Sequence, residues 1–230
     1  MTKKKVKVRV KKRKLKIGRI IICLLILAFL VAVFYYIKKL PIKNIYIIGN
    51  KVVPDGEILD ISGIKNYPSF IDTSKKEIIS KIKNNEYVKS VKVEKKIWGK
   101  IYIYIEEKKI LCIYNNKLLL EDSSLVDNNY NIYSYPTLIS DITNIFDRFV
   151  NKFSKVGDKA LHQISEIEYT PNEVDNERFS LMMDDGNLVY ITLSKVTKIN
   201  KYNSIYSSME EKKGIIYLDS GDYIEIKENE

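Results

Sequence analysis

The chain has few of the cysteine and histidine residues that build zinc sites and disulfides. Its 230 residues include two cysteines, one histidine and one tryptophan. No second imidazole and no Cys-x-x-Cys pair accompany His162, which argues against a zinc site. Cys23 lies inside a long apolar run and Cys112 lies far outside it, which argues against an internal disulfide. We expect His162 to be an ordinary polar residue in the connection 157–165.

Catalytic signatures are also missing. The sequence contains no GxSxG, SxxK or HExxH motif and no glycine-rich phosphate loop. Neighbouring residues on a strand point to opposite faces, so adjacent carboxylates do not form an acid–base dyad. We therefore expect solvated residues, and no catalytic residue, cofactor or metal, at the three carboxylate pairs Glu106-Glu107, Glu121-Asp122 and Asp184-Asp185. An anchored cell-wall hydrolase would need residues assembled from distant positions.

One long apolar segment stands out among the features that are present. Residues 20–37 contain no charge, proline or glycine. As a helix they would span about 27 Å, close to the apolar core of a bilayer, which is about 30 Å thick. The run is longer than the apolar part of a signal peptide and ends on the bulky Phe34, Tyr35 and Tyr36. The sequence therefore predicts an uncleaved transmembrane helix at residues 20–37.

Positive charge is concentrated before this helix. Residues 1–19 hold eleven of the 39 Lys and Arg and no acid, whereas only Lys38, Lys39 and Lys43 follow closely. Short flanking segments rich in Lys and Arg stay cytoplasmic, so we expect a single-pass type II protein in the cell membrane. Without this tail, 28 Lys and Arg face 29 Asp and Glu, and the net charge of +10 belongs to the tail. We expect a tail near anionic lipid and no nucleic-acid binding.

The first outer domain is predicted at residues 40–109, with the order β-α-α-β-β and both helices on one face of the sheet. Pro54 suits the start of the first helix, and Gly63 can end it. Ser74 and Glu77 predict a capping box at the start of the second helix, in which each side chain bonds the other residue's backbone N–H.

Two strands close this domain as a hairpin. Val91, Val93 and Ile97 share one face of the first strand, with Lys95 as the exception. After a turn at residues 98–100, apolar residues alternate with Tyr102 and Tyr104. The apolar residues of this second strand are Ile101, Ile103 and Ile105.

The second domain is predicted at residues 110–226 as a mixed or antiparallel sheet with helices on one side, followed by a tail at 227–230. Asp185-Gly186-Asn187 predicts a tight hairpin turn. Helices are predicted at residues 142–153 and 194–213, the second ended by a left-handed Gly214. The predicted strands are 111–114, 117–121, 164–169, 179–183, 188–193, 215–218 and 223–226.

The order of these parts resembles the FtsQ/DivIB cell-division proteins. Residues 45–50 (IYIIGN) look like the first strand and turn of the POTRA domain in that family. Residues 87–98 followed by 101–106 are similar to its closing hairpin, which ends on a characteristic glutamate. Residues 185–189 and 213–221 look like parts of its distal β domain.

The resemblance implies an α+β, non-enzymatic scaffold of the divisome, located at the septum. Such proteins bind FtsL and the FtsB/DivIC partner outside the membrane and help to control septal peptidoglycan synthesis, so a septal peptidoglycan synthase is a further implied partner. The POTRA domain is implicated in recruitment, and the β domain in the FtsB/DivIC contact. In this family the partner adds a strand beside the last strand of the β domain. The matching positions are Tyr217, Leu218, Asp219, Ser220, Gly221, Tyr223 and Ile224.

This site is also reasonable on physical grounds. A last strand near the chain end is a natural sheet edge, and its unpaired N–H and C=O groups can accept another strand. Alternatively, Tyr217 and Tyr223 pack on their own sheet, or residues 227–230 cover the edge. Another function that fits is a POTRA-bearing membrane transport or assembly component. Such proteins usually carry several tandem POTRA domains or a β-barrel, so the single predicted POTRA domain and single predicted transmembrane helix argue against this alternative.

Overall fold

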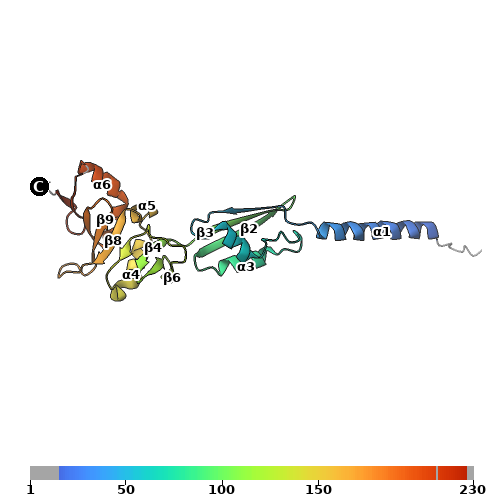
Figure 1. Cartoon of the computed structure of the whole chain (residues 1–230), viewed down its shortest axis with the longest axis horizontal. Helices are drawn as coiled ribbons and strands as arrows, with labels where there is room; N and C mark the ends of the chain where they lie inside the picture. Colours follow the sequence, from blue (N-terminus) through green and yellow to red (C-terminus); the bar gives the residue numbers. More distant parts are fainter. Residues whose placement is uncertain (1–15, 211, 227–230) are drawn as a thin grey trace, which may run out of the picture.

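The structure is a computed structural model that describes residues 16–210 and 212–226 (Figure 1). Its first element is α1 (Ile17–Lys38), which contains the predicted transmembrane residues 20–37. The 22-residue helix has a mean hydropathy of 3.1 in its most apolar window, and none of it is buried against the rest of the described chain. By length and composition, α1 can cross a membrane. The predicted basic tail up to residue 15 and the predicted C-terminal tail 227–230 lie outside the described residues.

The chain continues into a three-stranded sheet covered by two helices, which confirms the predicted β-α-α-β-β order. The strand order is β1-β3-β2, with β1 parallel and β2 antiparallel to β3. Ile101, Ile103 and Ile105 of β3 are buried against the helices, whereas Tyr102 and Tyr104 lie on the other face. The elements are β1 (Asn44–Ile48), α2 (Asp55–Ser62), α3 (Lys75–Lys83), β2 (Val88–Lys96) and β3 (Lys100–Glu107).

The helix boundaries follow the local signals, but the capping box is wrong. Gly63 ends α2 with φ +73°, the left-handed conformation that glycine tolerates. Ser74 is the N-cap residue of α3, yet its hydroxyl makes no capping hydrogen bond. The Glu77 carboxylate lies 2.7 Å from Lys81 Nζ, one helical turn further on. This ion pair gives Glu77 a different partner from the one the capping box requires.

The structure explains why Lys95 interrupts the apolar alternation of β2. Lys95 lies on the buried face because its ammonium donates hydrogen bonds to the carbonyls of Phe70 and Thr73, in the loop before α3. Burial lowers the pKa of Lys95, with a smaller contribution from the nearby charge of Lys75. The expectation that Ile97 shares the buried face is wrong, because its side chain is 77% exposed. The hairpin turns here, and the strand ends at Lys96.

A nine-stranded mixed sheet forms the second domain, in the order β12-β11-β10-β9-β8-β7-β4-β5-β6. The pairs β4–β7, β7–β8 and β10–β11 are parallel, and the others are antiparallel. The strands are β4 (Ile110–Tyr114), β5 (Lys117–Leu120), β6 (Leu125–Asp127), β7 (Thr137–Leu138), β8 (Ile164–Tyr169), β9 (Arg178–Met183), β10 (Leu188–Thr192), β11 (Gly214–Tyr217) and β12 (Tyr223–Ile226).

The helical segments differ from the prediction mainly near the C-terminus. The predicted helix 194–213 is a 3-10 helix, η2 (Leu193–Lys201), continued by the α-helix α6 (Tyr202–Ser208). The left-handed residue after it is Glu210, with φ +54°, so the expectation for Gly214 is wrong. Gly214 instead begins β11, where an added Cβ would lie 2.4 Å from the Glu225 carbonyl oxygen. The other helices are η1 (Thr143–Ile145), α4 (Phe146–Phe153) and α5 (Asp158–Leu161).

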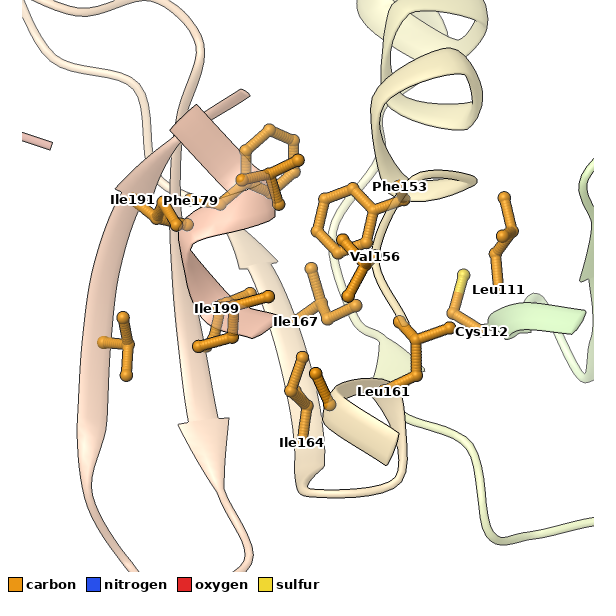
Figure 2. Packing of buried hydrophobic residues seen from close by; sticks show 14 of the residues in the cluster. Leu111, Cys112, Phe153, Val156, Leu161, Ile164, Ile167, Phe179, Ile191 and Ile199 are labelled. Carbon is orange, nitrogen blue, oxygen red and sulfur yellow. The ribbon is translucent and has the colours of Figure 1, made fainter. Parts of the chain in front are cut away.

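Aromatic and aliphatic side chains fill the core between this sheet and its helices (Figure 2). Phe153 of α4 lies beside Phe149, with ring centroids 4.1 Å apart, and both rings contact Phe179 of β9. Cys112 on β4 is fully buried here, and burial raises the pKa of its thiol. The predicted apolar stripe of residues 142–153 is therefore a packing surface.

The two domains share a continuous apolar contact. Buried residues of the β4–β5–β6 end of the large sheet belong to the same cluster as the core of the small domain. Two tyrosines add hydrogen bonds across the junction. Tyr87 Oη donates to the Asp127 carbonyl at 2.5 Å, and Tyr130 Oη donates to the Glu57 carboxylate at 2.9 Å. The residues of the large sheet in the shared cluster are Ile110, Leu118, Leu120 and Val126.

Candidate partner-binding edge

The predicted site residues all lie on the β11–β12 hairpin at one end of the nine-stranded sheet. Tyr217 ends β11, and Tyr223 and Ile224 begin β12. The remaining predicted residues form the connection between the two strands. In Figure 1 this hairpin belongs to the red C-terminal part of the chain, at the end of the molecule far from α1.

β12 is an edge strand, and all four of its residues are exposed. Within the described residues it pairs only with β11, in the register Tyr217↔Tyr223, Ile216↔Ile224 and Ile215↔Glu225. On its other side the backbone groups have no strand partner among residues 16–210 and 212–226.

The direction in which these backbone groups point follows from the hydrogen bonding between the neighbouring strands β10 and β11. The Leu218 N–H donates to the Tyr190 carbonyl of β10 at 2.8 Å. Backbone groups alternate in direction along a strand, so Ile215 and Tyr217 of β11 face β12. Their partners Glu225 and Tyr223 consequently face β11. The backbone N–H and C=O of Ile224 and of Ile226 therefore point to the open side.

An aromatic ladder crosses the outer face of the sheet and ends at this edge. The rings of Tyr190 and Tyr217 are stacked with centroids 5.4 Å apart, and those of Tyr217 and Tyr223 are 4.4 Å apart. The Arg178 guanidinium lies 3.8 Å from the centroid of the Tyr190 ring. A strand added beyond β12 would extend this surface. Sequence reasoning missed Arg178 and Tyr190, because their alignment with Tyr217 depends on the register of β9, β10 and β11.

The inner face of the hairpin borders a groove of about 410 Å³ between β12 and the η2–α6 segment. Ile205, Ile216 and Ile224 supply apolar walls, and Lys198 and Lys201 lie on its rim. Leu218 lines the groove as well, but only 5% of it is exposed, so its main contribution is packing.

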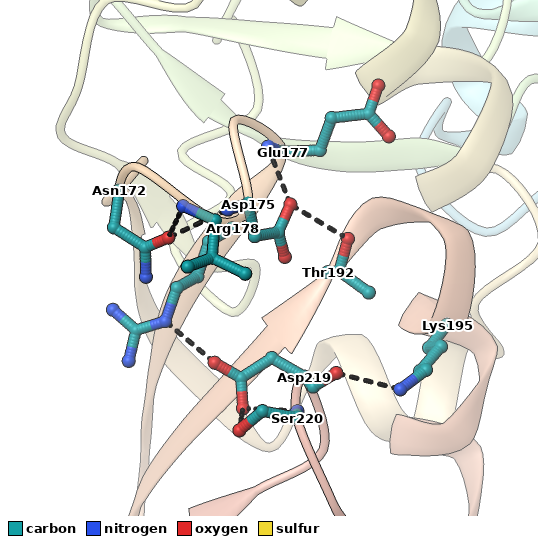
Figure 3. A network of polar contacts seen from close by, with 9 residues as sticks. Asn172, Asp175, Glu177, Arg178, Thr192, Lys195, Asp219 and Ser220 are labelled. Carbon is teal, nitrogen blue, oxygen red and sulfur yellow. Dashed lines mark hydrogen bonds and ion pairs between the residues drawn. The ribbon is translucent and has the colours of Figure 1, made fainter.

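Asp219 holds the connection between the two strands in place (Figure 3). Its carboxylate accepts a 2.7 Å hydrogen bond from Arg178 Nε and a 2.8 Å bond from the Ser220 N–H. Its carbonyl accepts a bond from Lys195 Nζ at 2.7 Å. Burial alone would raise the pKa of Asp219, but the hydrogen bonds from Arg178 and Ser220 outweigh it and lower that pKa. The Asp219 side chain is 8% exposed, so it anchors the hairpin and does not form contact surface.

The other candidate groups have structural partners. His162 Nδ1 lies 2.7 Å from the Ser134 carbonyl oxygen, and its ring packs on Tyr135. Asp185 accepts a hydrogen bond from Tyr202 Oη at 2.6 Å. The expectation that Glu107 is merely solvated is wrong, because its carboxylate accepts backbone bonds from residues 51–53. Among the residues that the structure describes, no group of three His, Cys, Asp or Glu could hold a metal ion.

Comparison with known proteins finds similarity to cell-division proteins. A family model described as "POTRA domain, FtsQ-type" matches residues 40–108. The chain is 29% identical over 225 residues to cell division protein DivIB of Bacillus subtilis (strain 168), an alignment that covers 93% of this chain and 86% of the relative. DivIB of Bacillus cytotoxicus is 26% identical over 240 residues, covering 98% of this chain and 93% of the relative.

A solved structure, the extracytoplasmic domain of DivIB from Geobacillus stearothermophilus, is similar with a TM-score of 0.38 and 19% identity, over 46% of this chain and 97% of that one. The sequence matches carry the comparison. A POTRA match of the FtsQ type directly after the apolar helix, together with similarity to DivIB proteins along nearly the whole chain, supports the resemblance to the FtsQ/DivIB family of cell-division proteins.

Proposed function

We propose that this divisome component is a membrane-anchored, non-enzymatic scaffold that docks a partner strand on the edge of β12. Its partners are FtsL and an FtsB/DivIC-type protein, and through them it helps to control septal peptidoglycan synthesis. The septal peptidoglycan synthase is a further proposed partner. The observation that carries the proposal is an exposed four-residue edge strand that pairs on one side only within the described chain.

The charge pattern supports the orientation of the scaffold. Eleven Lys and Arg precede the apolar run, and few cations follow it. Because loops rich in Lys and Arg stay in the cytoplasm, we place residues 1–19 on the cytoplasmic side and the two domains outside the membrane. The family resemblance supports a position at the division septum. We further propose domain limits of 40–109 and 110–226, with β12 at the far end from the anchor.

The chemistry of the edge supports strand addition. The backbone groups of Ile224 and Ile226 point outward, so an incoming strand would find donors and acceptors at the spacing of a sheet ladder. On one face the new strand would lie beside Tyr223 and its stacked neighbour Tyr217. On the other face it would lie beside Ile224 and the apolar groove. Tyrosine suits such a surface, because its ring is apolar and its hydroxyl tolerates water.

The substitution Ile224→Pro tests the proposal. It removes an outward N–H but no bond to β11, and proline is tolerated in edge strands. We expect the free energy of unfolding to change little and binding of the FtsB/DivIC-type partner to weaken by about tenfold, roughly 1.4 kcal/mol, since a ladder bond is lost and the ring obstructs the new strand. Co-purification and titration of the purified partner measure this effect.

Ile224→Val is the matched control, because it keeps the N–H and a β-branched side chain. It should bind nearly as the natural chain does. Equal binding by the Ile224→Pro and Ile224→Val variants would show that the partner does not use this edge.

A further inference from the structure

The end of the POTRA domain that meets α1 carries exposed apolar side chains. The topology identifies this end, because the chain enters β1 at Asn44 soon after α1 and β3 runs parallel to β1. The β2–β3 hairpin therefore turns at the same end, and Figure 1 shows it on the side of α1. At its tip, Ile97 and Trp98 are 77% and 75% exposed.

A second exposed segment, the loop between α2 and α3, lies beside the tip. The Lys43 N–H donates to the Gly99 carbonyl at 2.8 Å, and the Phe70 N–H donates to the Leu40 carbonyl at 2.8 Å. Hairpin tip and loop are thus both bonded to the chain that emerges from α1. We call the exposed apolar residues of these three segments the membrane-proximal face: Leu40, Tyr67, Ile71, Ile97 and Trp98.

We infer that the membrane-proximal face sits in the lipid headgroup layer of the membrane that α1 crosses, as a second lipid contact beside the helix. The inference rests on the anchor of the proposed function. Lys38 directly follows the apolar residues 20–37, and its carbonyl accepts a hydrogen bond from Ser69 Oγ at 2.5 Å. Each headgroup layer is about 5–8 Å thick, given a bilayer of about 40–45 Å with an apolar core of about 30 Å. The loop that contains Ser69 therefore starts inside this layer.

The composition of the face suits that layer. Tryptophan and tyrosine are enriched at membrane interfaces, where the ring is partly apolar and its polar edge is hydrated. Lys38 pairs with Asp72 at 3.5 Å, whereas Lys39 and Lys43 make no ion pair with any described residue. These two ammonium groups are placed to meet anionic lipid phosphates.

The hairpin tip keeps Trp98 in an unfavourable backbone conformation. Trp98 has φ +66°, a left-handed conformation that is an outlier for a bulky residue and that asparagine or glycine adopts more readily. Such outliers are typical of functional positions. The neighbouring loop is preformed by Lys95, whose ammonium lies 4.5 Å from the centroid of the Phe70 ring and donates to the Thr73 carbonyl.

Trp98 is the only tryptophan of the chain, so its fluorescence tests the inference directly. The full chain is reconstituted into vesicles of phosphatidylglycerol and phosphatidylcholine, with bromine placed at shallow or deep acyl positions. We expect shallow bromine to quench Trp98 more than deep bromine does, and acrylamide in the water to quench it weakly. Strong acrylamide quenching without bromine quenching would overturn the inference. It would favour a protein partner, and not lipid, as the contact of Ile97 and Trp98.

The matched control moves the tryptophan from the hairpin tip to the β domain. In the Trp98→Asn, Tyr133→Trp double variant, the tryptophan occupies a 74% exposed position of the β domain, and asparagine relieves the strain at the tip. It should respond to acrylamide and not to bromine; equal bromine quenching of both reporters would contradict a specific contact at the tip. A carbonate wash separates the two proposals. Loss of the chain from the vesicles would overturn the anchor, whereas a retained chain with unquenched Trp98 would overturn only the membrane-proximal face.

Discussion

At the scale of single residues, Glu107 shows how one carboxylate can order a loop. It ends β3 and accepts hydrogen bonds from the backbone N–H groups of Lys51, Val52 and Val53, with N–O distances of 2.9 Å for the shortest bond of each. These donors lie in the connection from β1 to α2. Glu107 therefore fixes that connection to the strand that leads into the second domain.

Glu107→Gln should lower the free energy of unfolding by about 1.5–3 kcal/mol, because hydrogen bonds to a charged acceptor are worth roughly that much and the amide has only one oxygen to offer. Urea unfolding of the full chain in detergent measures the change. Glu106→Gln is the control, since Glu106 is exposed and bonds Lys89 and Ser90 on the surface. A loss for Glu106→Gln as large as that for Glu107→Gln would contradict the role of Glu107.

The lowered pKa of Asp219 predicts that its contribution to folding stability depends on pH. Its pKa is lowered in the folded chain, so its contribution to stability is fully present above the unfolded pKa of about 3.9 and is lost as the pH falls through the lower folded value. Urea unfolding at decreasing pH should therefore show a difference between the natural chain and Asp219→Asn that shrinks in acid. A difference that stays constant below about pH 3.9 would exclude a stabilising ionised Asp219.

At the scale of elements, the β11–β12 hairpin depends on a close approach at Gly214. A side chain there would meet the Glu225 carbonyl oxygen at 2.4 Å, so β12 would have to move. We expect Gly214→Ala to cost about 1–3 kcal/mol and to weaken partner binding through a displaced β12. In Gly221→Ala the new methyl would meet its nearest neighbour at 3.5 Å, an ordinary contact, so this variant should behave like the natural chain. Thermal unfolding and partner titration compare the two variants, and equal behaviour would refute the packing argument.

Local patterns predicted the elements that carry strong signals. The alternation in β3 predicted the β2–β3 hairpin, and the Asp-Gly turn predicted the β9–β10 hairpin. The position of β12 as the last predicted strand indicated a sheet edge. Very short strands left no such signal, which is why β6 and β7 were missed. The switch from 3-10 to α-helix near Tyr202 was also missed, because both helices bury apolar residues at similar spacing.

Contacts between distant segments could not be predicted. Lys95 looked like an interruption of the alternation because its partners are carbonyls more than twenty residues earlier in the chain. The stacking of Tyr190 on Tyr217 likewise requires the parallel register of β10 and β11. The candidate edge was accessible from the sequence through the family resemblance, whereas the ladder and the groove beside it needed the structure.

At the scale of the whole molecule, the shared apolar cluster and the hydrogen bonds of Tyr87 and Tyr130 join the two domains. We therefore expect them to unfold together. Phe153→Ala, in the core of the second domain, should cost roughly 3–5 kcal/mol and should lower the hydrogen-exchange protection of Ile101 and Ile103 in the first domain by a similar amount. The half-exposed Met182 offers a mild control, Met182→Ala. Unchanged protection of the β3 amides in Phe153→Ala would show that the domains are independent.

The most direct test of the scaffold is hydrogen exchange at β12, measured residue by residue with and without a saturating FtsB/DivIC-type partner. The amides of Ile224 and Ile226 point outward and should exchange quickly in the unbound protein and slowly in the complex. The amides of Tyr223 and Glu225 already face β11 and should change little. Continued fast exchange at both outward amides in the saturated complex would contradict docking by strand addition.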